Sequence, residues 1–297
     1  MVCRSADENA IINTASSSPR LVARCDNIGQ GERKPMGHWD VVDVFACGLT
    51  LQGLIVMETL GWLHWLRNDP RFDARRMAAI GNSGGGTLTM FLGVLCAGEL
   101  AALSSSAYPS TFDHVARKEK KHCHCNVLPH IVGELEMWQI LGCAAPTPML
   151  IFQGKQDHFF PADLFRHLAR KVAAAYEFVN AGDRFQAHLL EGDHSWDLPR
   201  RRLLTRFLCE TLGVPFHPDR VTEETPLREI PPCFSVWPEA ALTADALARR
   251  LSGHRGPVAH HLWEVFPPRP PWPGMESSPL LGTDFRQIAA QFEAFLK

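Results

Sequence analysis

The sequence predicts an α/β fold in which helices flank a mostly parallel sheet. Short apolar runs of strand length alternate along the chain with longer segments whose apolar residues recur at helical spacing. Three of the apolar runs end at glycine-containing turns, where the backbone can change direction sharply. This alternation favours parallel strands, because parallel neighbours need a crossover connection that is usually a helix.

The first half of the chain supplies three of the expected strands and two long helices. A strand is expected near 21–25 and a long helix near 50–67. The apolar run near 76–81 has the length of a buried strand, and the helix expected near 84–95 follows a glycine-rich turn. A further strand is expected near 100–105.

The second half continues the alternation after a long insertion at 107–145, in which few periods are clear. Insertions at such a place often cover an active site, so this segment is a candidate lid and substrate surface. The elements expected next are a strand at 148–154, a helix, a strand at 185–192 and a final helix near 197–212. The apolar face of the first of these helices carries Leu164, Phe165, Leu168, Val172 and Tyr176.

A change of composition after Gly213 divides the chain into two parts. Residues 1–213 hold the alternating elements, and residues 214–297 form a C-terminal extension of different character. Within the extension we expect a short helix at 242–251 with Thr243 as its cap. The other expected elements are a linker at 214–232, a strand at 258–266, an extended proline-rich strap at 267–273 and an amphipathic helix at 283–296.

A serine flanked by glycines stands at the turn between one expected strand and the helix that follows it. The sequence there is Gly81-Asn82-Ser83-Gly84-Gly85-Gly86. Such a sequence between a strand and a helix is the signature of a nucleophile elbow, which exposes the serine hydroxyl at the edge of the sheet. Bulk at Gly81 or Gly85 would clash with neighbouring backbone in so sharp a turn.

An aspartate and a histidine each follow a later strand end. The chain order is Ser83, Asp157, His194, which is the order of the catalytic triad in α/β-hydrolases. Two competing assignments stay open. Asp193 is an alternative acid, although it adjoins the histidine, and His158 is an alternative base, although it adjoins the acid.

These residue types predict acyl transfer. His194 would take the proton of Ser83 and return it to the leaving group, while Asp157 would hold the imidazole tautomer. The backbone N–H of Gly84 is a candidate donor to the oxyanion. The sequence identifies neither the second donor nor the residues that bind substrate.

The stretch that leads into the elbow resembles a known family. A Trp-x-x-x-x-Pro segment (Trp65 to Pro70) is followed by an Asp-x-x-Arg segment (Asp73 to Arg76) and then by G-x-S-G-G-G. Further matches are Asp26 to Glu32, Ala144 to Pro148, Gly154 to Asp157 and Phe160-Pro161. Over about residues 20–213 the chain is similar to the acetyl xylan esterase-like branch of the α/β-hydrolases, which is related to dienelactone hydrolases and prolyl-oligopeptidase-type enzymes.

The resemblance implies the α/β-hydrolase fold and a serine esterase that removes short acyl groups, acetyl above all, from a carbohydrate or small ester. It implies no cofactor and no metal, and it leaves self-association open. A peptidase or a lactone hydrolase could use the same triad, although the repeat of an oligopeptidase propeller is not visible. An alternative hypothesis, from a different functional class, is a catalytically weak protein of this fold that binds a ligand or partner in the same pocket.

The chain departs from the family at its N-terminal side. Several strands precede this region in the family, and the loop after the third strand usually supplies the second oxyanion donor. Residues 1–20 are too short for those strands and a helix, and they hold no His-Gly pair. We therefore expect a sheet without its first strands, with a gap beside the nucleophile strand. A later segment or a second subunit would fill the gap, or the chain is a shortened version of a larger enzyme. The C-terminal extension is our candidate cover for the exposed edge.

Charge and hydropathy narrow the class of protein. The 297 residues are 45 % hydrophobic with a net charge of −2, which fits a soluble globular protein and gives no electrostatic case for nucleic acid. Residues 1–10 include acidic residues and lack the apolar core of a secretory signal. The apolar run 44–66 carries Gln52, Glu58 and His64, which favours a buried helix over a membrane span.

The cysteines indicate the redox setting. There are nine, scattered from Cys3 to Cys233, which favours reduced thiols in the cytoplasm over a disulfide framework. The run His122-Cys123-His124-Cys125, with His130 nearby, combines residue types that zinc prefers. A strand there would turn successive side chains to opposite faces, so we predict packed thiols rather than a metal site.

Overall fold

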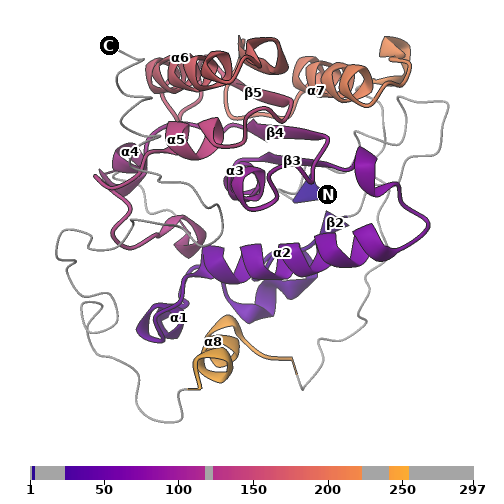
Figure 1. Ribbon diagram of the computed structural model, residues 1–297. Helices are drawn as coiled ribbons and strands as arrows, with labels where there is room; N and C mark the ends of the chain where they lie inside the picture. Colours follow the sequence, from indigo (N-terminus) through magenta and orange to yellow (C-terminus); the bar gives the residue numbers. More distant parts are fainter. Residues whose placement is uncertain (1, 4–23, 118–122, 223–240, 254–297) are drawn as a thin grey trace.

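A parallel sheet forms the centre of the computed structural model, which describes residues 2–3, 24–117, 123–222 and 241–253 (Figure 1). Within this part of the chain the sheet has six strands in the order β2-β1-β3-β4-β5-β6, and every neighbouring pair is parallel. The strands are β1 (Val2–Cys3), β2 (Arg24–Cys25), β3 (Ala78–Asn82), β4 (Ala102–Ser106), β5 (Met149–Gly154) and β6 (Phe185–Leu190). The predicted α/β fold with a parallel sheet is confirmed.

The strand beside the nucleophile strand β3 comes from the N-terminal residues. β1 lies between β2 and β3, with Val2 opposite Arg24 on one side and opposite Ile80 on the other. The expected gap beside β3 is therefore wrong, because β1 fills it. A strand of two residues has no measurable alternation of apolar and polar side chains, so the pattern could not predict it.

Helices and 3-10 turns connect the strands. The α-helices are α1 (Val42–Ala46), α2 (Leu51–Asn68), α3 (Gly84–Leu95), α4 (Phe112–Arg117), α5 (Met137–Gly142), α6 (Ala162–Phe178), α7 (Leu198–Thr211) and α8 (Ala244–Ser252). The 3-10 turns are η2 (Gly31–Met36), η3 (Ala74–Arg76), η4 (His124–Asn126), η5 (Gly182–Arg184) and η6 (Pro218–Arg220). Side chains cap two of the helices at their N-termini: for α2, Thr50 Oγ1 accepts from Gly53 N, and for α7, Asp197 accepts from Arg200 N.

The two faces of the sheet are covered by different helices. On one face, β-strand residues such as Leu103 and Ile151 belong to a core cluster with side chains of α2, α3, α5 and α6. On the other face, Ile80, Leu150 and Phe152 form a second cluster with Leu204, Phe207 and Leu208 of α7. Strands β4 and β5 are buried along their whole length. Because helices cover both faces of this parallel sheet, the strand sequences are continuous runs of apolar or small residues and do not alternate with polar ones.

The insertion at 107–145 holds more structure than its weak periodicity predicts. It contains α4, η4 and α5. Helix α5 packs between α3 and α6, with Met137, Ile140 and Leu141 in the core. Its start is fixed by a capping box in which the Glu136 backbone N–H donates to Gln139 Oε1 over 2.8 Å.

Helix α8 of the C-terminal extension packs on α1 (Figure 1). Val44 N donates to Asp245 Oδ1 over 3.0 Å, and Arg249 forms an ion pair with Asp43 at 2.7 Å. The predicted cap is confirmed, since Thr243 Oγ1 accepts from Ala246 N over 3.1 Å. The strand, strap and terminal helix predicted for the extension lie outside the described residues.

The apolar run at 44–66 forms α1 and most of α2 rather than a membrane span. In the described residues, no helix combines the length and the apolar character needed to cross a bilayer. Glu58 of this run is paired with Arg33 at 2.7 Å, and Gln52 is buried.

Candidate active site

Ser83 occupies a strained backbone position between β3 and α3. Its φ is 53° and its ψ is −119°, a conformation that residues other than glycine rarely adopt. The backbone N–H of Ser83 donates to Ser106 O at the end of β4 over 2.9 Å. The residue is half-buried and is the N-cap of the twelve-residue helix α3, so it stands at the carboxyl edge of the sheet.

Glycines permit the turn because the backbone segments on its two sides touch. A Cβ placed on Gly81 would run into the carbonyl group of Gly85, and one placed on Gly86 would lie 2.8 Å from Ser106 O. A buried side chain of the neighbouring strand adds support, because Ser106 Oγ donates to Asn82 Oδ1 over 2.9 Å and to Gly81 O over 3.3 Å. The sharp turn is thus built into the packing of β3, β4 and α3.

The acid follows β5 and is held by three hydrogen bonds. Asp157 is buried, and its Oδ1 accepts from the backbone N–H of Phe159 over 2.8 Å and of Phe160 over 3.1 Å. Its Oδ2 lies 2.8 Å from Nδ1 of His194, whose side chain is 14 % exposed. Buried Gln153 closes the turn, because its Nε2 donates to Phe160 O over 2.6 Å. The bond at Nδ1 leaves Nε2 of His194 as the ring atom available to a substrate or a nucleophile.

A second Asp–His pair joins the same two loops, with the acid and the histidine exchanged between them. Asp193 Oδ1 lies 2.7 Å from His158 Nδ1 and also accepts from His158 N over 2.9 Å. These hydrogen bonds, the backbone one first, lower the pKa of Asp193 to about 2. Each loop therefore supplies an acid to the histidine of the other loop. The carboxylate of Asp193 reaches the backbone N–H of His194 but pairs with the ring of His158, so the geometry favours Asp157 as the partner of His194.

Arg200, near the start of α7, holds the histidine loop, which is the segment after β6 that carries His194. It is 1 % exposed, and its Nη2 donates to Glu191 O over 3.0 Å and to Asp193 O over 3.1 Å. Its Nη1 pairs with Asp197. The loop also presses on Gly154, where a Cβ would meet the carbonyl oxygens of residues 192 and 193. The end of β5 and the histidine loop are therefore fixed against each other.

The parallel order of the strands gathers the three predicted residues at one edge. Ser83, Asp157 and His194 each follow the carboxyl end of a strand, those of β3, β5 and β6. Within the described part of the chain no hydrogen bond joins Ser83 to His194. Such bonds are often long in enzymes without substrate and tighten when substrate binds. Aromatic rings border the histidine, with the Phe159 centroid 4.9 Å and the Phe160 centroid 6.1 Å from its own.

The structure shows where Gly84, the predicted oxyanion donor, lies. Gly84 is exposed as the first residue of α3, and the first N–H groups of a helix lack intrahelical acceptors and carry the positive end of its dipole. The described residues offer no assignment for the second donor. A cavity of about 450 Å³ lies elsewhere, between α6 and β6, and none of the three predicted catalytic residues lines it.

The sequence reasoning missed the polar residues that hold the site in place: Asn82, Ser106, Gln153 and Arg200. A signal existed for Gln153, a polar residue near the end of an otherwise apolar strand. It also existed for Asn82, which precedes the serine. Arg200 lies in a run of three arginines, and nothing in the sequence distinguishes it from the other two.

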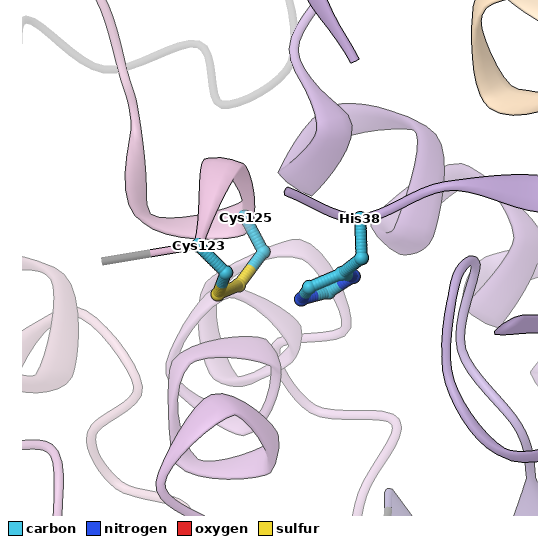
Figure 2. A group of neighbouring side chains, drawn as sticks. All are labelled: His38, Cys123 and Cys125. Carbon is cyan, nitrogen blue, oxygen red and sulfur yellow. A yellow bond between two sulfur atoms is a disulfide. The ribbon is translucent and has the colours of Figure 1, made fainter. Parts of the chain in front are cut away.

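The cysteines of the predicted cluster lie beside a histidine that is distant in sequence, not beside the histidines expected from the run. His122 lies outside the described residues, and His130 is exposed with a φ of 63°. Cys123 and Cys125 instead approach His38, and the three ligand atoms lie within 4.8 Å of one another (Figure 2). The premise of a strand is wrong, because residues 124–126 form the 3-10 turn η4. Burial lowers the pKa of His38.

The chain is similar to solved structures of esterases. To methylesterase BT1017 it has a TM-score of 0.50 and 20 % identity, over 67 % of this chain and 44 % of that chain. A glucuronoyl esterase from Solibacter usitatus gives a TM-score of 0.46 and 15 % identity, over 55 % and 49 % of the two chains. A putative acetyl xylan esterase from Bacteroides fragilis NCTC 9343 gives 0.45 and 19 %, over 56 % and 46 %.

These similarities concern the fold. The likeness to methylesterase BT1017 shows that the described sheet and helices have the α/β-hydrolase fold. The chain spans about half the length of these solved structures. No protein-family model matches the chain, and no curated protein matches it.

Proposed function

We propose that this chain, which has the α/β-hydrolase fold, is a serine esterase that acts through Ser83, His194 and Asp157. The observation that carries the proposal is the hydrogen bond of 2.8 Å between buried Asp157 and His194, at the sheet edge where Ser83 stands on a strained turn. A buried carboxylate that orients a histidine close to such a serine is the arrangement that activates a hydroxyl.

In the proposed reaction, Nε2 of His194 takes the proton of Ser83 as the hydroxyl oxygen attacks the ester carbonyl carbon. Asp157 accepts from Nδ1 and stabilises the imidazolium that forms. The oxyanion receives a hydrogen bond from Gly84 N–H at the N-terminus of α3. Histidine then protonates the leaving alcohol, and a water molecule releases the acyl group from Ser83 by the same steps in reverse.

The proposed substrates are small or oligosaccharide esters of short acyl groups, acetyl above all. The resemblance of the elbow region to acetyl xylan esterase-like enzymes supports this choice, and no cofactor enters the reaction. The odd number of cysteines supports a cytoplasmic setting, and the small net charge gives no support to a nucleic-acid partner.

The test compares hydrolysis of p-nitrophenyl acetate and of longer-chain esters by the full chain and by Ser83→Ala. We expect the wild type to prefer acetate and the variant to lose activity on the order of 10³-fold or more. Ser252→Ala, on the exposed end of α8, is the matched control and should keep full activity. Labelling of the wild type by a fluorophosphonate, absent in Ser83→Ala, would identify the nucleophile directly.

The outcome that contradicts the proposal is a folded wild type that neither hydrolyses these esters nor labels. In that case a binding protein of the same fold becomes the better interpretation. The specific observations in its favour are the missing hydrogen bond between Ser83 and His194 and the unassigned second oxyanion donor.

A further inference from the structure

We propose that His38, Cys123 and Cys125 form a binding site for a thiophilic divalent cation, with zinc as the ion that fits best. Their ligand atoms, two Sγ and one imidazole nitrogen, lie within 4.8 Å of one another. A tetrahedral zinc site, with Zn–S of about 2.3 Å and Zn–N of about 2.0–2.1 Å, spaces its ligand atoms roughly 3.5–4 Å apart. The limit of 4.8 Å on the separation of the three atoms is close to that spacing.

The imidazole of His38 is oriented as a ligand. It is buried, and its Nδ1 lies 2.9 Å from Ile28 O, to which it donates as an N–H. This bond fixes the tautomer and leaves the lone pair on Nε2. Figure 2 shows the ring pointing toward the two sulfur atoms. Histidines that bind zinc commonly donate their other ring N–H to a carbonyl or carboxylate in this way.

The cysteines have a supporting donor as well. The amide nitrogen of Asn126 lies 3.4 Å from Cys123 Sγ and 3.5 Å from Cys125 Sγ. Its Oδ1 is buried with no hydrogen-bond partner among the described residues, so the contacts with sulfur orient the side chain. A donor shared by two sulfurs stabilises negative charge on them, which is the state in which thiols bind metal.

The chemistry of the group selects the ion. Two thiolates balance the charge of a divalent cation, and this matters because Cys125 and His38 are buried. Sulfur and imidazole ligands favour zinc over magnesium or calcium, which prefer oxygen. Three protein ligands leave one tetrahedral position, which a water molecule fills in zinc sites of this kind.

The structure joins Cys123 and Cys125 as a disulfide, whereas the proposed site requires the reduced pair. Binding of the cation involves no oxidation, because each thiol loses a proton to the solvent and its sulfur donates an electron pair to the metal. A disulfide would offer no thiolates, so the two states of this pair exclude each other.

The site would connect two segments that are distant in sequence. The segment at 123–126 belongs to the insertion, and His38 precedes α1. His124 N donates to His38 O over 3.3 Å, and Val41 N donates to His124 Nδ1 over 3.2 Å. A cation here would fasten the insertion to the segment between η2 and α1.

The experiment measures zinc in the full chain purified under reducing conditions without chelators. We expect about one zinc per chain by elemental analysis. The ratio should fall to near zero in His38→Ala and in the double variant Cys123→Ser/Cys125→Ser. Cys143→Ser, which removes an exposed thiol outside the group, is the matched control and should keep the metal.

A second measurement uses only the wild type, in case the variants do not fold. Equimolar zinc added to the reduced, metal-free protein should raise its thermal midpoint, and cobalt in place of zinc should give thiolate-to-metal charge-transfer absorption. The proposal is overturned if the reduced wild type retains no zinc after desalting, or if Cys143→Ser loses as much zinc as the ligand variants. It is equally overturned if thiol titration of the freshly purified protein finds the pair oxidised and reduction restores no metal binding.

Discussion

Arg200 is a single residue on which the geometry of the histidine loop depends. It donates to the carbonyl oxygens of Glu191 and Asp193 and pairs with Asp197, all while buried. We predict that Arg200→Met lowers kcat on the order of 10- to 100-fold with little change in KM, because a displaced base costs catalysis more than binding. Two carbonyl groups would lose their hydrogen-bond donor, at about 1 kcal/mol of stability for each bond.

Arg202→Met is the control for this prediction. Arg202 lies on the same helix but is exposed, so the same change there should leave kcat almost unaltered. Steady-state kinetics on a p-nitrophenyl ester and thermal unfolding of both variants provide the comparison. Equal losses in the two variants would show that Arg200 does not position the loop.

At this scale the sequence predicts the candidate catalytic residues better than the residues that hold them in place. Ser83, Asp157 and His194 stand at strand ends with recognisable neighbours. Arg200 and Gln153 do not, because their burial follows from carbonyl oxygens that approach from distant loops. An arginine within a basic run is expected in solvent, and only the folded chain shows that this one lies beneath a loop.

The elbow is the element whose geometry is most demanding. A Cβ on Gly81 would collide with backbone atoms of Gly85, which cannot move without displacing the first turn of α3. We predict that Gly81→Ala causes a large loss of thermal stability or of soluble protein, together with loss of esterase activity, since the strained serine depends on the same turn.

Gly61→Ala is the matched control for the elbow. A Cβ on Gly61, within α2, meets nothing within 4 Å. Replacing a helical glycine by alanine should stabilise the protein by about 0.5–1 kcal/mol. Thermal unfolding followed by circular dichroism distinguishes the two variants. If both variants melt as the wild type does, the turn is more adaptable than its packing indicates.

Element boundaries follow the periodicity where it is strong and fail where it is absent. Helix α3 spans the predicted 84–95, and the capped helix α8 differs by a residue or two from the predicted range. The short elements β1, α1 and η4 have five residues or fewer, which is too few for an apolar pattern to define. Their formation depends on partners far along the chain.

Across the whole molecule, α8 ties the C-terminal part to the first described helix. Ala248 is fully buried in the interface with α1, and Arg249 reaches Asp43. We predict that Ala248→Glu separates α8 from α1, since a carboxylate cannot be buried there without a partner. Hydrogen exchange at the amide of Val44, which donates to Asp245, should accelerate.

Leu251→Glu places the same charge on the exposed side of α8 and should leave that exchange rate unchanged. Exchange followed by mass spectrometry on both variants tests the contact. An unaltered rate at Val44 in Ala248→Glu would mean that α8 contributes nothing to the protection of α1. The sequence predicted the helix and its cap, but its partner depends on residues some two hundred positions apart, which local patterns cannot relate.

The position of β1 bears on how the chain folds as it is made. Its neighbour β3 leaves the ribosome only after α2 has been translated, roughly 4–16 s after β1 at about 5–20 residues per second. Until then the backbone groups of β1 that face β3 have no strand to pair with. The pairing of β1 with β3 therefore forms late. It is a long-range contact of the kind that slows folding. A nascent chain arrested between the two strands would expose β1, the future neighbour of the strand that leads to Ser83, as an unpaired edge.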